Sequence, residues 1–474
     1  MKRERPNPKA NRSLVLFACV VTGLFLCLIG YLGYFLQTQR EFVINNSYNA
    51  RLDKFAERVV RGEIRSRDGE VLAYTRTGED GAEQRVYPYG DLFAHPVGYA
   101  DYGRSGLEAL SNFYLLSSHT SPANQLLNEF SGSKNTGDNV TTTLDVGLQQ
   151  AADEALGGRK GSVVALDPRT GQILAMVSRP SFDPNTLAED WDSLISGDNT
   201  EAQLLNRVSQ GLYPPGSVFK LVTVLEYIRE YPDTWQDFVF DCDGVYEYGD
   251  YSISCYHGNA HGQQTLPQAF ANSCNGAFAS IGLELDAGTW RSLAGDLLFN
   301  GSLPLEIAYS KSSFSLSAES SEWEVLQTAI GQGGTLMSPL HAAMLTAAIA
   351  NGGTLMTPYL IDYVESAAGE EQRNFAPTVY GELMSKQEAE ILTELMRGVV
   401  AAGTGSAVRT DAYSAAGKTG SAEYQTGKET HAWFTGFAPV EDPEIVVTAV
   451  VEEGGSGGHT AAPVARAVFD AYFR

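Results

Sequence analysis

Apolar and polar positions divide the chain into a membrane-length segment, a stretch of mixed texture and a long region of strands and helices. Residues 14–36 carry no charged side chain. At about 1.5 Å per residue they would reach roughly 35 Å as a helix, enough to cross a bilayer core of about 30 Å. Most of the charged residues in 1–13 are basic, a bias that is typical of segments on the cytoplasmic side of a membrane. We therefore predict a cytoplasmic basic tail over 1–13, a single-pass cell-membrane anchor over 14–36 and an extracytoplasmic remainder.

A cleaved signal peptide is the competing interpretation of this segment. Its apolar region usually spans about 7–15 residues and ends at a small-x-small cleavage site. Residues 34–39 (YFLQTQ) offer no such site, so the uncleaved anchor is favoured. The polar residues that follow, 37–60, have the pattern of a helical stalk.

Strand patterns lie at both ends of the remaining chain. Residues 61–73 predict two short strands around an Asp-Gly turn, and residues 161–177 predict a second hairpin. Residues 117–143 are rich in Ser, Thr, Asn and Gly, which predicts a loop or module boundary. The C-terminal part predicts a last helix around 461–473, preceded by three strands at 413–422, 432–437 and 445–451.

The roughly 230 residues between the second hairpin and these strands have a mostly helical pattern. Strands at both ends of a helical middle predict an α+β fold, with one antiparallel sheet flanked by helices and a helical subdomain. We expect a small mixed domain over residues 37–157 and a second domain over residues 158–474.

Composition and charge narrow the function classes. A chain of 474 residues with 43% hydrophobic and 19% charged residues is long and apolar enough for two folded units. The net charge of -24 argues against nucleic acid as a partner, because phosphate recognition needs clustered Lys and Arg.

Two cysteines outside the anchor, Cys242 and Cys255, lie in a polar stretch rich in Gly and Tyr. They could close a disulfide loop in an oxidising exterior, and two free thiols are the equal alternative. A zinc site built from these cysteines with His257 and His261 has suitable residue types. Its spacing fits no standard ligand pattern, so we predict no metal and no cofactor.

Ser217 and Lys220 are the strongest candidates for catalysis. A Pro-Pro-Gly stretch precedes Ser217, and residues 217–228 predict a buried helix that is apolar nearly all round. Residues three apart share a helix face, so the Lys220 amine can reach the Ser217 hydroxyl. Burial disfavours the ammonium form of a lysine, which leaves a neutral amine to serve as general base. The Ser217 backbone N–H, at the positive helix end, can face a developing oxyanion.

The Ser-x-x-Lys pattern is weak by itself, since about two copies are expected by chance in a chain of this length. A second copy, Ser131 with Lys134, lies in a polar stretch that predicts no helix to bury its lysine. Ser217 is therefore the copy with a mechanism.

Two further motifs follow Ser217 in order. Ser273, Cys274 and Asn275 place a hydroxyl and an amide two residues apart, where both can point into one cleft. A predicted strand then carries a second lysine and small hydroxyl residues that could bind a substrate carboxylate: Lys418, Thr419, Gly420 and Ser421. Each motif alone is compatible with an ordinary turn or edge strand. Together and in this order, they form the signature of penicillin-binding proteins and class A β-lactamases.

At these residues the chain resembles class B penicillin-binding proteins, the monofunctional D,D-transpeptidases of bacterial peptidoglycan synthesis, which β-lactams inhibit. Its short N-terminal domain is most similar to that of the compact PbpA-like members. The resemblance covers nearly the whole chain and includes residues 61–69 and 103–108 of the non-catalytic pedestal, and residues 161–185, 331–333, 350–353 and 433–439 of the transpeptidase domain.

The resemblance implies a role for each motif residue. Ser217 would attack the carbonyl between two terminal D-alanines while Lys220 takes its proton, and Ser273 would pass a proton to the leaving D-alanine. Asn275 would hold the donor peptide, and residues 418–421 would face its terminal carboxylate. The backbone N–H groups of Ser217 and Ser421 would form the oxyanion hole.

The family also implies partners and roles: peptidoglycan stem peptides, β-lactam antibiotics, a SEDS-family glycosyltransferase in the membrane, and a part in cell shape or cell division. A membrane-anchored β-lactamase is one alternative, but no extra base for deacylation can be placed. A β-lactam sensor or an inactive scaffold of a wall-synthesis complex is another. The short cytoplasmic tail disfavours the sensor, and the intact motifs disfavour the scaffold.

Overall fold

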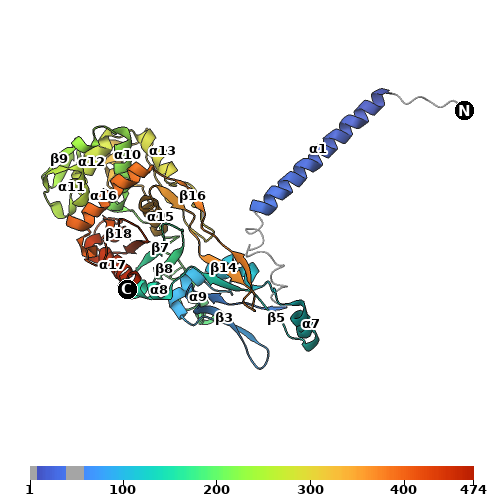
Figure 1. Cartoon of the computed structure of the whole chain (residues 1–474). Helices are drawn as coiled ribbons and strands as arrows, with labels where there is room; N and C mark the ends of the chain where they lie inside the picture. Colours follow the sequence, from blue (N-terminus) through green and yellow to red (C-terminus); the bar gives the residue numbers. More distant parts are fainter. Residues whose placement is uncertain (1–7, 39–57) are drawn as a thin grey trace.

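The computed structural model describes residues 8–38 and 58–474 (Figure 1). The first helix, α1 (Pro8–Thr38), begins inside the predicted basic tail. It contains the segment Arg12–Phe35, the one helix in the described part of the chain that is long and apolar enough to cross a membrane. Most of the predicted stalk, residues 39–57, lies outside the described residues.

A five-stranded antiparallel sheet forms the centre of the C-terminal region, in the order β17-β18-β19-β7-β8. The second predicted hairpin and the three C-terminal strands are confirmed. Every residue of β18 and β19 is buried, which explains why these strands read as continuous apolar runs. The strands are β7 (Gly161–Leu166), β8 (Ile173–Arg179), β17 (Ala416–Ala422), β18 (His431–Ala438) and β19 (Ile445–Val451).

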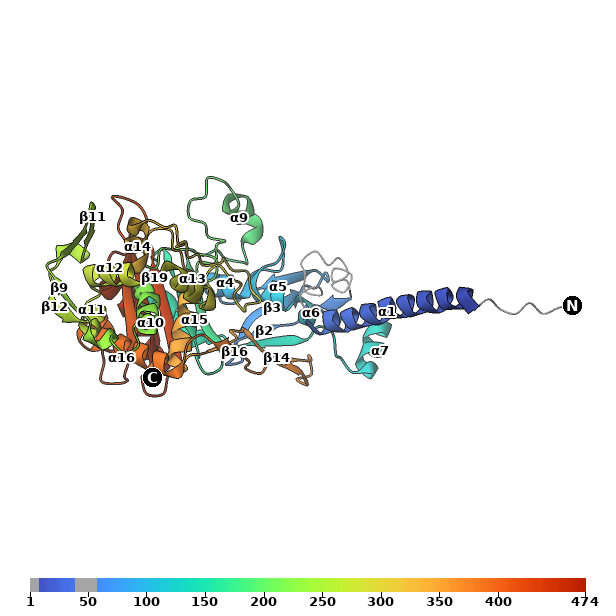
Figure 2. The ribbon, with the colours of Figure 1, turned by 90° about the horizontal axis from the view of Figure 1, so that it is seen from above.

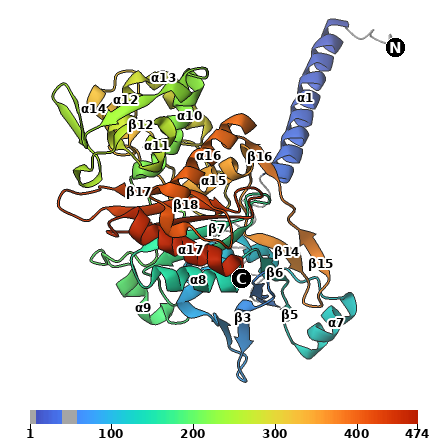
Figure 3. The same cartoon turned by 60° about the vertical axis from the view of Figure 1, so that its left-hand side comes forward.

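Helices cover both faces of this sheet, so the predicted α+β architecture is confirmed (Figure 3). α8 (Val146–Leu156) and the last helix α17 (Ala462–Tyr472) pack side by side on one face. α15 (Pro339–Ala350), buried along nearly its whole length, packs on the other face against β7, β18 and β19.

The middle of the chain forms the helical subdomain beside β17. Its helices are α10 (Lys220–Glu230), α11 (Leu266–Ala271), α12 (Asn275–Glu284), α13 (Ala287–Asp296), α14 (Glu322–Ala329) and α16 (Lys386–Ala402). The expectation of a mostly helical middle missed the short strands between them: β9 (Val239–Cys242), β10 (Val245–Tyr248), β11 (Tyr251–Ser254), β12 (Gly262–Thr265), β13 (Thr354–Met356) and β16 (Val379–Glu382). Each of these strands has only 3 or 4 residues and pairs with one other strand. A strand this short gives no clear alternating pattern of apolar and polar residues.

A second, six-stranded sheet in the order β15-β14-β6-β2-β3-β4 lies between the helical body and α1 in Figure 2. The predicted Asp-Gly hairpin is confirmed as β2 and β3. The loop expected over residues 117–143 is wrong, because this segment contains α7 (Pro122–Ser131) and two strands. The remaining elements are β1 (Val59–Val60), β2 (Ile64–Arg65), β3 (Val71–Thr77), β4 (Glu83–Val86), α4 (Ala94–Val97), α5 (Gly106–Leu110), α6 (Asn112–Leu115), β5 (Asn135–Thr136), β6 (Asn139–Thr142), α9 (Leu187–Leu194), β14 (Ile361–Glu365) and β15 (Glu371–Asn374).

Two contacts tie this sheet together. β14 and β15 come from the C-terminal half of the chain, and β14 pairs with β6 so that Val364 lies opposite Val140. Beneath the sheet, the fully buried Glu108 accepts from Arg61 at 2.6 Å and from Arg85 at 2.7 Å. Burial favours the neutral acid, but these two guanidinium groups outweigh it and hold the pKa of Glu108 below its ordinary value. The two signature stretches of the N-terminal domain thus meet in one buried ion cluster.

Candidate active site

The candidate nucleophile lies on a tight turn that packs against the edge strand β17. A 3₁₀ turn, Gly216–Phe219, leads into α10, so the predicted helix begins with a tighter turn at Ser217. Gly216 has φ +53°, and a Cβ there would meet the carbonyl oxygen of Ser421 at 2.9 Å. Only glycine fits this backbone without strain. This close approach puts Ser217, which is half-buried, beside the Ser421 end of β17.

Lys220 is buried completely, one turn after Ser217. Its Nζ donates to the carbonyl oxygen of Ser273 at 2.7 Å and to Oδ1 of Asn275 at 2.8 Å, and it lies 3.3 Å from the Ser273 hydroxyl. The Phe278 ring lies 5.2 Å from the amine. Burial lowers the pKa of Lys220 to about 7, so a large fraction of the amine is neutral at neutral pH.

Ser273 joins the two buried lysines. Its Oγ accepts from Lys418 at 2.9 Å and lies 3.3 Å from the Lys220 amine. Ser273 has φ +57°, the left-handed region that a residue other than glycine adopts only where its surroundings hold it. Burial and the neighbouring Lys220 amine lower the pKa of Lys418 well below its ordinary value. The hydroxyl of Ser273 is therefore positioned to pass a proton between two amines.

Asn275 is the first residue of α12, and its side chain bridges two elements. Its Oδ1 accepts from Lys220, while its Nδ2 donates to the carbonyl oxygen of Ser254 on β11 at 2.9 Å. The second predicted motif therefore lies against the first, as the order of motifs indicated.

The third motif lies on β17, in the order expected from the sequence. The Thr419 hydroxyl hydrogen-bonds the hydroxyl of Thr404 at 2.5 Å, and the Ser421 hydroxyl accepts from the backbone N–H of Gly457 at 3.1 Å. At Gly420, a Cβ would meet the Pro215 carbonyl oxygen at 2.9 Å, which explains a glycine inside this strand. Sequence reasoning missed Thr404 and Gly457, which follow a helix and a strand in Gly-rich turns and carry no spacing signal of their own.

The described residues include no hydrogen-bond partner for the hydroxyl of Ser217. A direct contact between Lys220 and Ser217 therefore stays a prediction, and catalytic hydrogen bonds often tighten only when substrate is bound. The second Ser-x-x-Lys copy differs, because Lys134 is exposed and pairs with Glu83 at 2.8 Å. Of the two Ser-x-x-Lys copies, the one at Ser217 combines a half-buried hydroxyl with a buried lysine.

Cys242 and Cys255, for which a disulfide and two free thiols were equal alternatives, are free thiols here, with their Sγ atoms 3.7 Å apart. Cys274 and His261 lie beside them, whereas His257 is exposed and does not belong to this group. The described residues thus bring together four groups that differ from the four considered from the sequence.

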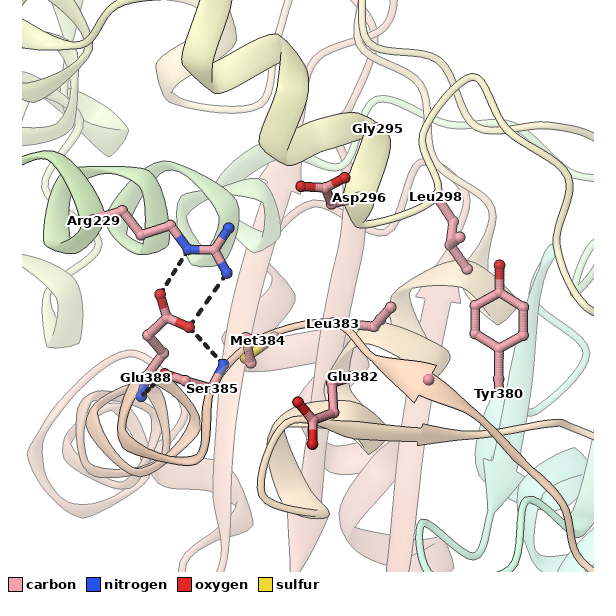
Figure 4. Close-up of a pocket in the computed structure, with 11 residues that line it drawn as sticks. Arg229, Gly295, Asp296, Leu298, Tyr380, Glu382, Leu383, Met384, Ser385 and Glu388 are labelled. Carbon is pink, nitrogen blue, oxygen red and sulfur yellow. Dashed lines mark hydrogen bonds and ion pairs between the residues drawn. The ribbon is translucent and has the colours of Figure 1, made fainter.

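A hollow away from these motifs contains no predicted site residue. It measures about 710 Å³ and lies between the ends of α10 and α13, strand β16 and the start of α16 (Figure 4). On its wall Arg229 donates to Glu388 at 2.6 Å, and Glu388 also accepts from the backbone N–H of Ser385. These contacts cap α16 and join it to α10, a structural role.

A half-buried serine beside a buried amine of lowered pKa can attack a carbonyl and form an ester intermediate. A second lysine, two hydroxyls and a strand edge offer donors for an anionic substrate group. Acyl transfer is the chemistry that this arrangement supports.

Comparisons with known proteins agree with this chemistry. Residues 161–470 match the family model of the penicillin-binding protein transpeptidase domain, and residues 61–140 match that of the penicillin-binding protein A dimerisation domain. The peptidoglycan D,D-transpeptidase PbpA of Mycolicibacterium smegmatis is 33% identical over 89% of this chain and 90% of its own length.

Two solved structures are similar to most of the chain. The D,D-transpeptidase domain of a peptidoglycan glycosyltransferase from Eggerthella lenta has a TM-score of 0.79 at 35% identity, covering 88% of this chain and 98% of that one. Penicillin-binding protein A of Mycobacterium tuberculosis, in its imipenem acyl-enzyme complex, has a TM-score of 0.80 at 31% identity, covering 89% of this chain and 100% of that one.

Proposed function

The chain belongs to the penicillin-binding protein transpeptidase family, and from this premise we propose that it is a membrane-anchored peptidoglycan D,D-transpeptidase and a target of β-lactams. The observation that carries the proposal is the contact of three distant motifs around one hydroxyl. Lys220 and Lys418 both reach the Oγ of Ser273, at 3.3 and 2.9 Å.

In the proposed acylation, the Oγ of Ser217 attacks the carbonyl carbon between the two terminal D-alanines of a stem peptide. Lys220 accepts the hydroxyl proton, a role that its burial and lowered pKa support. The backbone N–H groups of Ser217 and Ser421 hold the oxyanion of the tetrahedral intermediate. The amide C–N bond then breaks, which leaves an ester on Ser217.

The leaving D-alanine needs a proton on its amine. Ser273 supplies it and is reprotonated by Lys220, a relay that their hydrogen-bond distances support. Asn275 orients the donor peptide. Lys418, Thr419, Gly420 and Ser421 face its terminal carboxylate, which the carboxylate of a β-lactam mimics.

A second stem peptide completes the reaction. Its side-chain amine attacks the ester carbonyl, Ser217 leaves with its proton restored, and a new peptide bond cross-links the two strands. Atoms balance, since one D-alanine is released for each cross-link formed.

The apolar helix α1 and the basic residues before it support a membrane location for this activity. We propose that the basic N-terminus stays in the cytoplasm, as the positive-inside rule favours, and that the catalytic domain lies outside the membrane. We further propose boundaries of 37–157 for the pedestal and 158–474 for the transpeptidase domain. A SEDS-family glycosyltransferase is the proposed membrane partner, in a machinery of cell shape or division.

The direct test is incubation of the full chain in detergent with a donor stem peptide that ends in D-Ala-D-Ala and an acceptor amine. We expect release of D-alanine together with a cross-linked product, detected by mass spectrometry. Rapid turnover of a β-lactam with no peptide product would contradict the proposal and indicate a β-lactamase.

A further inference from the structure

Three thiols and one imidazole converge directly behind the second motif. The Sγ atoms of Cys242, Cys255 and Cys274 and a ring nitrogen of His261 all lie within 4.8 Å of one another. Three cysteines and one histidine are a common ligand set for structural zinc.

The separations match the edges of a coordination tetrahedron. With Zn–S bonds of about 2.3 Å, two sulfurs of a tetrahedral site lie about 3.8 Å apart. The Sγ of Cys255 lies 3.7 Å from that of Cys242 and 3.8 Å from that of Cys274. The Nδ1 of His261 lies 3.3 Å from the Sγ of Cys242, close to the value of about 3.5 Å expected for a sulfur and a nitrogen ligand. A disulfide would instead need an S–S distance of about 2.05 Å.

The backbone holds these four residues in place from separate elements. Cys242 ends β9, and β12 pairs with β9 so that His261 donates its backbone N–H to the Cys242 carbonyl at 3.0 Å. Cys255 follows the β10–β11 hairpin and is fixed by its N–H bond to Gly244 at 2.9 Å. Cys274 stands immediately before α12. The site therefore needs three-dimensional pairing, which explains why its spacing resembles no linear motif.

The surroundings suit thiolate ligands. The three cysteines are at most 3% exposed, and His261 is only half-buried, which leaves a route for the metal to enter. The sulfur of Cys255 accepts from the backbone N–H groups of Asn275 and Gly276, at the start of α12. Such N–H donors stabilise a thiolate that binds a metal.

We propose that Cys242, Cys255, His261 and Cys274 bind one Zn²⁺ ion in a closed tetrahedral site. Coordination would protect these thiols from oxidation outside the cell and replaces the Cys242–Cys255 disulfide considered from the sequence. The metal has no open coordination position in this ligand set, so its role is structural.

The zinc site has a consequence for catalysis because Cys274 stands between Ser273 and Asn275. A metal bond at Cys274 fixes the backbone on which Ser273 keeps its positive φ and meets both lysines. Cys274 is thus a positioning residue that acts through its neighbours. This second part rests on the proposed function, whereas zinc binding itself does not.

Metal content tests the site directly. We expect the full chain, purified in detergent without added metal or chelator, to contain about one zinc ion by inductively coupled plasma mass spectrometry. Replacement by Co²⁺ should give the visible bands and thiolate charge-transfer absorption of a tetrahedral thiolate site. A chain free of metal that does not take up added Zn²⁺ would overturn the proposal, whether its thiols are free or joined in a disulfide.

Two neighbouring histidines provide a matched pair of variants. We expect His261→Ala to weaken zinc binding at least tenfold. Replacing a residue that only supports a metal ligand already lowers metal affinity about 10–100-fold, so loss of a ligand should cost at least as much. His257→Ala, four residues earlier and exposed, should bind zinc as the unchanged chain does. Equal zinc affinity of the two variants would overturn the assignment of His261. If His261→Ala does not fold, the metal content of the unchanged chain still tests whether the zinc site exists.

Chelation separates the positioning role from mere stability. Removal of zinc should lower the first-order acylation rate constant for penicillin by up to about 10²-fold, the cost of a displacement of about 1 Å. The initial binding constant should change little, and Zn²⁺ but not Mg²⁺ should restore the rate. Zinc loss without any change in acylation would refute the positioning role and leave the metal site standing. Absence of acylation in the zinc-loaded chain would instead contradict the proposed function.

Discussion

The pH dependence of acylation is a sharp test of Lys220 as the general base. Lys220 is buried beside Ser273 and Asn275, and burial lowers its pKa to about 7. Only the neutral amine can accept the Ser217 proton, so the acylation rate should rise with pH and level off above about pH 8. The pKa of Lys220 shifts downward because burial disfavours the charged ammonium form.

The size of the effect follows from the two pKa values. With a pKa of about 7, about 91% of the amine is neutral at pH 8 and about 9% at pH 6, so the rate should fall about tenfold between them. An ordinary lysine, with a pKa of about 10.4, would be less than about 1% neutral at pH 8. Its rate would continue to rise about tenfold per pH unit towards pH 10. The two cases are easily separated.

The assay is stopped-flow acylation by a fluorescent penicillin between pH 5.5 and 9.5, with circular dichroism at each pH to show that the fold is unchanged. Lys220→Ala should lower the plateau by about 10²–10⁴-fold, the usual contribution of a general base. A rate that climbs steadily to pH 9.5, or that does not depend on pH, would refute the reasoning. Because Lys418 is close by, the apparent pKa belongs to the pair of amines.

Three further changes test the surrounding structure. Glu108→Ala should lower the free energy of unfolding by about 3–5 kcal/mol in urea titrations, since it leaves two largely buried guanidinium groups without a carboxylate partner. Gly216→Ala should slow acylation, because its Cβ would press on the Ser421 carbonyl and its φ is positive. Thr404→Val removes the hydrogen bond to Thr419 and should weaken penicillin binding by about 1 kcal/mol, roughly fivefold, with little loss of stability.

Matched controls exist for the glutamate and glycine changes. Glu154→Ala, at an exposed position of α8, should leave the urea midpoint unchanged. Gly295→Ala, where an added Cβ meets no atom within 4 Å, should acylate normally. Equal unfolding energies for the two glutamate variants, or equal acylation of the two glycine variants, would contradict the corresponding account. Unchanged penicillin affinity of Thr404→Val would remove Thr404 from the site.

Much of the fold could be predicted because its strands are regular. β19 matches its predicted span residue for residue, since a run of β-branched and small apolar residues in a buried strand has no competing interpretation. The helix α7 was missed because its polar composition, rich in Asn and Ser, matches a loop as well as a helix. The β9–β12 pairing depends on contacts between segments separated by a hairpin, which local patterns do not contain.

Part of the candidate site could likewise be predicted from the sequence, and part required the structure. Ser217, Lys220, Ser273 and Lys418 could be proposed from motif order, because each motif is contiguous and their sequence is diagnostic. The positive φ of Ser273 and the convergence of its Oγ with both lysines required the structure. Cys242, Cys255 and His261 were considered together from the sequence, but Cys274 was not, because its approach to Cys255 depends on the three-dimensional fold.

The measurement that tests the central claim most directly is the site of covalent labelling by penicillin. After incubation of the full chain with fluorescent penicillin, peptide mass spectrometry should locate the adduct on Ser217, and Ser217→Ala should abolish labelling. Ser131→Ala, in the other Ser-x-x-Lys copy, should label normally. Undiminished labelling of Ser217→Ala, or an adduct on another residue, would contradict the account.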